Sequence, residues 1–311
     1  MAQATCSLCR AGAIYRSPYS GLFFCARCFK RSVEDRVRTT INRFKLFSPS
    51  DRVLVAASGG KDSAVLLRSI VKLESRWGVE VMALTVDEGV EGYRERGIEQ
   101  ARRMAEELRV PHYVTSFKEE YGYTLEEIQC IASRKGLPFN ACTFCGVLRR
   151  RLINLKARRL GATKVATGHN LDDEAQTAFI NILRGCVDRL ARLRAGPSRA
   201  WEGFVPRVKP LRYIPEREVA LYAYLTGVEM YEDECKFVEA SLRHEVRWML
   251  NKLDARHPGV KYALVSVVDR LAPLLEGGLK GRVGFCKHCG EPTSREICRA
   301  CEVLEELGIS T

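Results

Sequence analysis

Short apolar runs and longer amphipathic stretches alternate through the middle of the chain. Apolar runs of strand type occupy 52–57, 79–89, 111–117 and 164–170. Apolar residues recur with helical spacing in 64–78, 93–110, 124–136, 145–161 and 172–185. Because short continuous runs are typical of strands and the wider spacing is typical of helices, the alternation predicts a parallel, doubly wound α/β sheet. Ligands bind such sheets beyond the carboxyl ends of the strands, where residues 58–63, 87–89 and 168–173 fall.

The pattern changes after position 185. Segment 186–214 has no sustained periodicity and is punctuated by glycine and proline residues, which favour turns and loops. Helical spacing returns in 215–228, 237–257 and 261–277. We therefore expect C-terminal helices to follow an irregular segment.

Composition adds two unusual features to this picture. Among the 311 residues, 46% are hydrophobic and 28% are charged, which is ordinary for a soluble globular chain and argues against disorder. No apolar run approaches the roughly 18 residues of a membrane span, and we expect no signal peptide and a cytoplasmic protein. The net charge of +12 indicates a polyanionic partner such as nucleic acid, and the 13 cysteines indicate metal or redox chemistry.

Eight of the cysteines form two quartets of paired CxxC motifs at the chain ends. The pairs are separated by 15 residues in the first quartet and by 8 in the second. Two CxxC turns complete a closed tetrahedral site for a structural Zn(II), which leaves no open position for catalysis. Although His288 is an alternative ligand, each quartet already has four thiols. We therefore predict two zinc sites, made by Cys6, Cys9, Cys25 and Cys28, and by Cys286, Cys289, Cys298 and Cys301.

The other cysteines lie in the middle of the chain. Cys142 and Cys145 form a third CxxC, which alone is ambiguous between a redox pair and part of a cluster site. Cys130, Cys186 and Cys235 are single. Because Cys130 lies on the apolar stripe of its predicted helix, we expect it to be a small buried apolar residue.

A glycine turn follows the first predicted strand and opens the next helix. Its sequence, Ser58-Gly59-Gly60-Lys61-Asp62-Ser63, is shorter than the Walker A motif but suits the same ligand. The glycines permit a turn whose backbone N–H groups face an anion, and the helix N-terminus adds partial positive charge. Lys61 supplies a further positive charge, and Asp62 can hold Mg(II). These features predict a phosphate site.

This turn resembles the SGGxDS signature of the PP-loop ATP pyrophosphatases, which bind ATP and release pyrophosphate. A second segment, Thr167–Thr177 with the sequence TGHNLDDEAQT, is similar to the GHxxDDxxET motif of tRNA-modifying members. With the central CxxC and the two quartets, the resemblance narrows to the archaeal and eukaryotic tRNA 2-thiouridine synthetases and covers nearly the whole chain. It implies an N-terminal zinc finger at 1–35, a PP-loop catalytic domain with C-terminal helices at 36–275, and a C-terminal zinc finger at 276–311.

The resemblance also implies cofactors and site residues. A [4Fe-4S] cluster would be held by Cys142, Cys145 and one later cysteine, for which Cys235 fits best by order and context. Cys130 and Cys186 are the remaining candidates. ATP with Mg(II) would meet residues of the turn, the next strand end and the second motif, and Arg149 four residues after Cys145. These nucleotide residues are Ser58, Gly59, Gly60, Lys61, Asp62, Ser63, Val86, Asp87, Arg149, Gly168 and Asp173.

The mechanism implied by the resemblance is a two-step 2-thiolation of tRNA. Uridine O2 attacks the α-phosphorus of ATP while Lys61 and Mg(II) stabilise the charge, and sulfide on an open iron then attacks C2 and displaces AMP. Lys61, Asp62, Cys142 and Cys145 are the expected catalytic residues. The partners would be tRNA, a ubiquitin-like sulfur carrier with a C-terminal thiocarboxylate, and a second copy in a homodimer.

Three alternatives stay open. The target is expected in the T-loop, but the anticodon wobble uridine would need the same chemistry. A persulfide on Cys142 or Cys145 could carry the sulfur without a cluster. A nonenzymatic zinc-finger RNA-binding protein would explain the charge and the quartets, but it leaves the glycine turn, the second motif and the central CxxC without a purpose.

Two stretches contain most of the excess positive charge. Segment 184–212 has a net charge of +6 and segment 27–45 a net charge of +5. Clustered Arg and Lys suit contacts to RNA phosphates, and Trp201, Phe204 and Tyr213 could stack on bases. The simpler interpretation of either stretch is a solvated basic surface that makes no contact with RNA.

Overall fold

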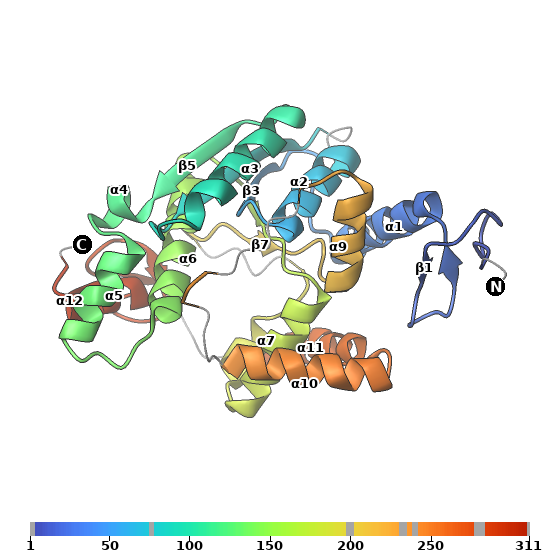
Figure 1. Cartoon of the computed structure of the whole chain (residues 1–311). Helices are drawn as coiled ribbons and strands as arrows, with labels where there is room; N and C mark the ends of the chain where they lie inside the picture. The colour runs from blue at the N-terminus through green and yellow to red at the C-terminus, as the bar shows by residue number, and fades with distance from the viewer. Residues whose placement is uncertain are drawn as a thin grey trace.

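The central element of the fold is a parallel sheet, visible in a computed structural model that describes residues 4–74, 78–196, 202–229, 235–237, 242–276 and 284–309. Its five strands are ordered β5-β4-β3-β6-β7 (Figure 1). They are β3 (Arg52–Ala56), β4 (Glu80–Asp87), β5 (His112–Ser116), β6 (Lys164–Ala166) and β7 (Arg207–Val208). The predicted α/β sheet is confirmed, with one added strand: β7 has two residues, too few to show a periodic pattern.

The strand order determines where a ligand can enter. From β3 the chain runs outward to β4 and β5, and it then returns to β6 on the other side of β3. A reversal of this kind opens a crevice beyond the carboxyl ends of the two strands that flank it. The crevice therefore lies at the ends of β3 and β6, which carry the glycine turn and the second motif.

The two faces of the sheet are covered by different helices, because successive side chains of a strand point to opposite faces. Val53 and Val55 belong to a core with α1 (Ala26–Phe44), α2 (Lys61–Glu74), α3 (Arg94–Glu107) and α9 (Glu216–Leu225). Leu54 belongs to a second core with α6 (Ala141–Arg159). The alternation along one strand thus separates the side that supports the phosphate turn from the side that carries the central CxxC.

Helix α1 was not predicted from the sequence, where its segment was noted only for its basic charge. Its buried residues Phe29, Val33, Val37 and Ile41 recur every four positions, which is the spacing of one helix face. Helix α6 also begins earlier than the predicted 145, because the Asn140 side chain caps it by accepting from the Thr143 N–H at 3.0 Å. Cys142 and Cys145 therefore lie inside the first turns of α6.

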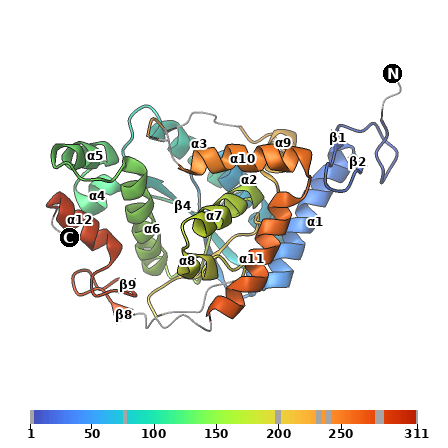
Figure 2. The same ribbon diagram turned by 90° about the horizontal axis from the view of Figure 1, so that it is seen from below.

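The helix of the second motif, α7 (Leu171–Leu183), packs with α8 (Val187–Ala191) and with two C-terminal helices. These are α10 (Leu242–Arg256) and α11 (Val260–Glu276), and the four helices lie together in Figure 2. Their apolar core includes Leu171 and Ala175 of α7 with Val246 and Leu250 of α10. None of the helices in the described ranges is long and apolar enough to cross a membrane.

The two ends of the chain form small modules at opposite ends of the molecule (Figure 1). The N-terminal module has a hairpin of β1 (Tyr15–Arg16) and β2 (Phe23–Phe24). The C-terminal module has β8 (Gly284–Phe285), β9 (Pro292–Thr293) and α12 (Arg299–Leu307), and it packs beside α4 (Phe117–Tyr121) and α5 (Leu125–Arg134).

Candidate functional site

The glycine turn between β3 and α2 is closed by its own serines. The Ser63 hydroxyl lies 3.1 Å from the Ser58 hydroxyl, accepts from the Ser58 N–H at 3.1 Å and donates to the Gly60 carbonyl at 2.9 Å. Ser63 is buried. The turn is thus preformed by side chains from both of its ends, as a phosphate cradle requires.

Two glycines let other segments approach this turn. Gly59 has a φ of +85°, and a Cβ there would meet the Gly97 carbonyl oxygen at 2.0 Å. Gly168, which follows β6, approaches the same turn closely. A Cβ on Gly168 would lie 3.0 Å from the Ser63 nitrogen and 2.9 Å from the Asp62 carbonyl carbon. The structure therefore brings the two predicted motifs together as one site.

Asp62 is held by the second motif. Its carboxylate accepts from the Asn170 amide at 2.9 Å and pairs with Lys61 at 3.1 Å. The side-chain oxygen of Asn170 caps α7 by accepting from the Asp173 backbone N–H, and the Asp173 carboxylate in turn accepts from the Asn170 backbone N–H. Burial and the nearby Asp62 raise the pKa of Asp173 to about 6. Two carboxylates next to a phosphate turn offer the oxygen ligands that Mg(II) prefers.

The two aspartates of the second motif differ in role. Asp172 is buried and ion-paired with Lys261 of α11, so it anchors the C-terminal helices. Asp173 faces the turn. His169 bonds the Thr167 hydroxyl at 2.7 Å, and desolvation together with the positive charges of Lys209 and Arg243 lowers its pKa.

Sequence reasoning missed Arg94, which is buried beneath the turn. Its guanidinium donates to the Ser58 carbonyl at 2.9 Å and to the Val86 carbonyl at 2.8 Å, and it pairs with Glu88 at 2.9 Å. Arg94 therefore joins the ends of β3 and β4. Arg94 lies at a buried position of α3, where an apolar side chain is usual. This misfit was its one signal in the sequence.

Glu88 connects this assembly to the CxxC helix. Its second oxygen lies 3.2 Å from the Arg149 guanidinium, and the Glu88 side chain is buried while Arg149 is 48% exposed. Arg149 lies one turn after Cys145 on α6. The nucleotide residues predicted on the strand end and on α6 are thus brought together at one edge of the sheet.

The third CxxC lies beside Cys235. The Cys142 thiol donates to the Phe237 carbonyl at 3.1 Å, and Cys145, Cys235 and Phe237 share one apolar cluster. Burial raises the pKa of Cys142, and it raises that of Cys145 to about 11; Cys235 adds to both shifts. Three thiols therefore come together from two distant segments, with Cys142 exposed.

The spacing of these three thiols differs from that of the quartets. Among the described residues, only the two terminal quartets bring three or more potential metal-binding groups within 4.8 Å of one another. Cys142, Cys145 and Cys235 therefore do not form a group as tight as either quartet.

The remaining cysteines were only partly predicted. Cys130 is exposed on α5, so the expectation that it is buried is wrong. Its helix buries Leu125, Ile128 and Ala132 instead, which places Cys130 on the outward side. Cys186 is partly exposed, and its thiol lies 3.6 Å from the Arg184 carbonyl.

Both terminal quartets bring their four thiols together as predicted. In each, the second CxxC begins a helix, with Cys25 capping α1 and Cys298 capping α12 through N–H to sulfur contacts of 3.5 Å and 3.4 Å. Although burial opposes ionisation, backbone N–H groups lower the pKa of Cys6 and of Cys286 to about 6. Thiolates are the form that binds Zn(II). His288 pairs with Glu305 at 2.6 Å and is no ligand here.

Several basic residues expected to face RNA are used inside the protein. Arg212 is 1% exposed and pairs with Glu174 and Asp269, and Lys209 bonds Glu174 at 2.6 Å. Tyr213 bonds Asp269 and stacks on Phe44, which removes it from base stacking. Phe204 is 41% exposed, and Trp201 lies outside the described residues. Charge counted along a segment overestimates what its surface displays.

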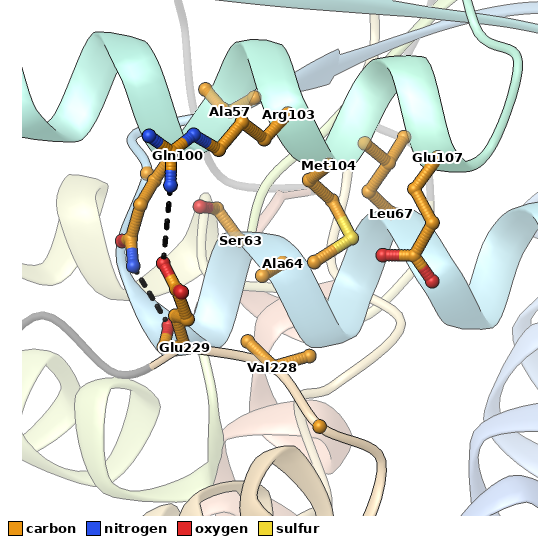
Figure 3. A pocket seen from close by; sticks show the side chains of 13 residues that line it. Ala57, Ser63, Ala64, Leu67, Gln100, Arg103, Met104, Glu107, Val228 and Glu229 are labelled. Atoms are coloured by element: carbon orange, nitrogen blue, oxygen red, sulfur yellow. Dashed lines mark hydrogen bonds and ion pairs between the residues drawn. The ribbon is translucent and has the colours of Figure 1, made fainter.

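A small cavity lies behind the turn, between α2 and α3 (Figure 3). Gly59 and Ser63 border it, and Gln100 and Arg103 of α3 bridge to Glu229 at 3.1 Å and 3.8 Å. Its volume of about 210 Å³ is below the roughly 300 Å³ at which ligand pockets begin. We assign no ligand to it.

Comparison with known proteins gives a consistent result over the whole chain. Residues 30–253 match the PP-loop domain family model. Cytoplasmic tRNA 2-thiolation protein 1 of Xenopus laevis is 37% identical over 305 residues, covering 97% of this chain and 88% of that protein. The tRNA 2-thiolation protein NcsA of Haloferax volcanii is 35% identical over 322 residues, covering 97% and 98%. The solved U34-tRNA thiolase NcsA of Methanococcus maripaludis, with its [4Fe-4S] cluster, superimposes with a TM-score of 0.86 at 34% identity, covering 100% of this chain and 99% of that one.

Proposed function

We infer the function of this chain from its family: it belongs to the PP-loop proteins that include NcsA and cytoplasmic tRNA 2-thiolation protein 1. We propose that it is a tRNA sulfurtransferase that replaces the C2 oxygen of a uridine with sulfur at the cost of one ATP. One observation supports this most strongly. The phosphate turn, Arg94, Glu88 and Arg149 form a continuous set of contacts that ends one turn from Cys145.

The turn would hold the phosphates of ATP. Backbone N–H groups of Gly59 to Ser63 and the N-terminus of α2 would bind the leaving pyrophosphate, and Lys61 would neutralise its charge. Asp62 and Asp173 would hold Mg(II). The adenine would lie near Val86 and Asp87 at the end of β4, and Arg149 would meet the nucleotide from α6.

The first half-reaction activates the uridine. A bond forms between uridine O2 and the α-phosphorus, and the bond from that phosphorus to the pyrophosphate oxygen breaks. In the second half-reaction the C2–S bond forms and the C2–O bond breaks, so that AMP leaves with the uridine oxygen. Lys61 would act on the leaving pyrophosphate, and Arg149 would hold the adenylate.

The residues present fit a [4Fe-4S] cluster. Cys142, Cys145 and Cys235 would hold it, and because three thiolate ligands leave one iron with a free coordination position, it would supply a binding position for the sulfide that the sulfur donor provides. The likeness to a cluster-containing thiolase over the whole chain supports this assignment. The two quartets would hold Zn(II), and the division at 1–35, 36–275 and 276–311 stays a prediction.

The target uridine is a separate question. The sequence favoured the T-loop, whereas the full-length likeness to a U34-tRNA thiolase favours the anticodon wobble uridine, and we propose the wobble position. A ubiquitin-like carrier with a C-terminal thiocarboxylate is proposed as the sulfur source and a homodimer as the assembly. As the names of the cytoplasmic relatives suggest, we place the protein in the cytoplasm.

Anaerobically purified protein, unmodified tRNA, ATP and a sulfide source test the proposal. We expect tRNA-dependent release of pyrophosphate and AMP, with one 2-thiouridine located by mass spectrometry of nuclease fragments. Absence of nucleotide turnover with tRNA would leave only an RNA-binding protein. A 2-thiouridine found in the T-loop instead of at U34 would restore the T-loop target.

Three cysteine variants separate the cluster from a persulfide route. We expect Cys235→Ser to lose iron and thiolation together, whereas the exposed Cys130→Ser and the partly exposed Cys186→Ser keep both. Full thiolation by iron-free protein would refute the cluster.

A further inference from the structure

Lys61 of the phosphate turn is held between two carboxylates, only one of which belongs to the turn. Its ammonium lies 3.1 Å from Asp62 and 3.1 Å from Glu216, the first residue of α9. Glu216 is 155 positions away in sequence and belongs to neither motif. We propose that Glu216, held by Arg247 of α10, is a positioning residue that orients the Lys61 ammonium for the departing pyrophosphate.

The backbone of Glu216 is fixed by the second motif. Its N–H donates to the Asp172 carboxylate at 2.8 Å, and Asp172 is in turn paired with Lys261 of α11. Pro215 precedes it in the extended conformation that begins α9. Asp172 therefore holds the first residue of α9 in place, and the Glu216 side chain extends from there toward the turn.

The side chain of Glu216 is fixed from the other side by α10. One guanidinium nitrogen of Arg247 lies 3.1 Å from one carboxylate oxygen of Glu216 and 3.2 Å from the other. The first of these oxygens also accepts from Lys61, so the carboxylate is held between the two cations. Arg247 is 45% exposed and Glu216 26%, so the pair contributes little to stability. Its value lies in the geometry it imposes on Lys61.

The donor count of Lys61 shows what this geometry does. An ammonium group has three N–H donors, and Asp62 and Glu216 accept two of them. One donor remains for a phosphate oxygen, and its direction is determined by the other two. Without Glu216 the ammonium can rotate about the Asp62 contact, and misplacement of a catalytic group by about 1 Å can cost on the order of 100-fold in rate.

This inference rests on the proposed ATP chemistry and gives it a specific kinetic signature. We expect Glu216→Ala to lower kcat for tRNA-dependent pyrophosphate release by about 10- to 100-fold, with a change in the KM for ATP below about 3-fold. The KM for ATP should change little because two effects oppose each other. Loss of the negative charge of Glu216 favours binding of the ATP phosphates, whereas loss of the fixed Lys61 orientation disfavours it. Glu216→Gln keeps an acceptor oxygen and should recover part of kcat.

Arg247 should act only through Glu216. We expect Arg247→Gln to lower kcat by about 3- to 10-fold, and to have less than about a 2-fold effect in the Glu216→Ala background, since a double-mutant cycle reveals shared action. Glu245→Gln and Arg256→Gln are matched controls, because both residues are exposed on the same helix. Neither control should change kcat.

The outcomes separate this inference from the proposed function. If the unmodified protein releases no pyrophosphate with tRNA, the proposed function fails and the inference fails with it. If the unmodified protein is active and Glu216→Ala keeps kcat within about 2-fold, only the inference is overturned. A variant with a raised KM and a lowered melting temperature would also overturn it, because Glu216 would then be a structural residue of α9.

Discussion

The two cysteine quartets have the same ligands but are joined to the rest of the protein in different ways. In the N-terminal module, Phe24 and Cys28 pack on the core of α1, α2 and α9, and two tyrosine hydroxyls bond helices: Tyr15 donates to Glu218 at 2.9 Å and Tyr19 to Asp254 at 2.7 Å. In the C-terminal module, Cys286, Cys298 and Cys301 belong to the same apolar core as Phe144 and Leu148 of the CxxC helix. Both modules are therefore joined to an apolar core, but only the C-terminal one packs on the helix that carries Cys142 and Cys145.

A buried polar contact strengthens the C-terminal attachment. Glu291, between the two halves of the second quartet, accepts from the Asn154 amide at 3.0 Å and pairs with Arg158 at 2.7 Å. Glu291 and Asn154 are both buried. Both partners lie on α6, so the module holds the helix that carries Cys142 and Cys145. Loss of metal from the C-terminal quartet should therefore disturb the candidate site on α6.

The largest effect is expected from two separate variants, each of which removes one cysteine of one quartet. Cys301→Ser should destabilise the protein by more than about 3 kcal/mol, because a buried ligand and the core around it are lost together. Iron content and thiolation should fall with it. Cys9→Ser, at an exposed ligand of the other quartet, should lose one zinc and keep the iron. Equal loss of iron in both variants would contradict the comparison.

Glu291→Ala tests the polar part of the C-terminal attachment. Removing this carboxylate leaves a buried donor of Asn154 without its partner, whereas Arg158 is 41% exposed and can turn to water. The loss should cost about 2 kcal/mol in urea unfolding. The variant should still bind two zinc ions, since Glu291 is no ligand. Unchanged stability would show that the apolar core alone holds α6.

Metal removal should follow the exposure of the ligands. Cys9 is exposed, whereas three of the four C-terminal ligands are buried. A chelator should therefore remove the N-terminal zinc first, about 10-fold faster, which corresponds to a difference of about 1.4 kcal/mol in the barrier. Zinc release followed by a colorimetric dye, with Cys9→Ser as the reference for a single remaining site, measures this. Faster release from the C-terminal quartet would reverse the ranking.

The smallest effect is expected at the N-terminal tyrosine contacts. Tyr19→Phe removes the hydroxyl that donates to Asp254, while Asp254 keeps the Gly259 N–H as a donor at 3.0 Å. The cost should be about 1 kcal/mol, the usual value for one hydrogen bond. Thermal unfolding measures it, and thiolation should be unchanged. A loss of activity would mean that the N-terminal module influences the candidate site through α10, which carries Asp254.

Much of the candidate site could be predicted because its signals are local. The turn Ser58–Ser63 and the capping sequence after Gly168 each adopt their shape from residues within six positions of one another. The four thiols of each quartet are likewise close in sequence. Sequence reasoning failed where a side chain's surroundings come from distant segments, as for Arg94 under the turn and Arg212 in its buried ion pairs.

The strand–turn–helix units, the phosphate turn and the two quartets follow from the amino-acid order alone, because short-range geometry and periodicity specify them. The packing of distant elements determines which charges are buried and which face of α5 exposes Cys130. It also determines that Glu216 and Arg247 reach Lys61. The physical reason is that burial and ion pairing depend on which elements pack together, and no local pattern records that choice.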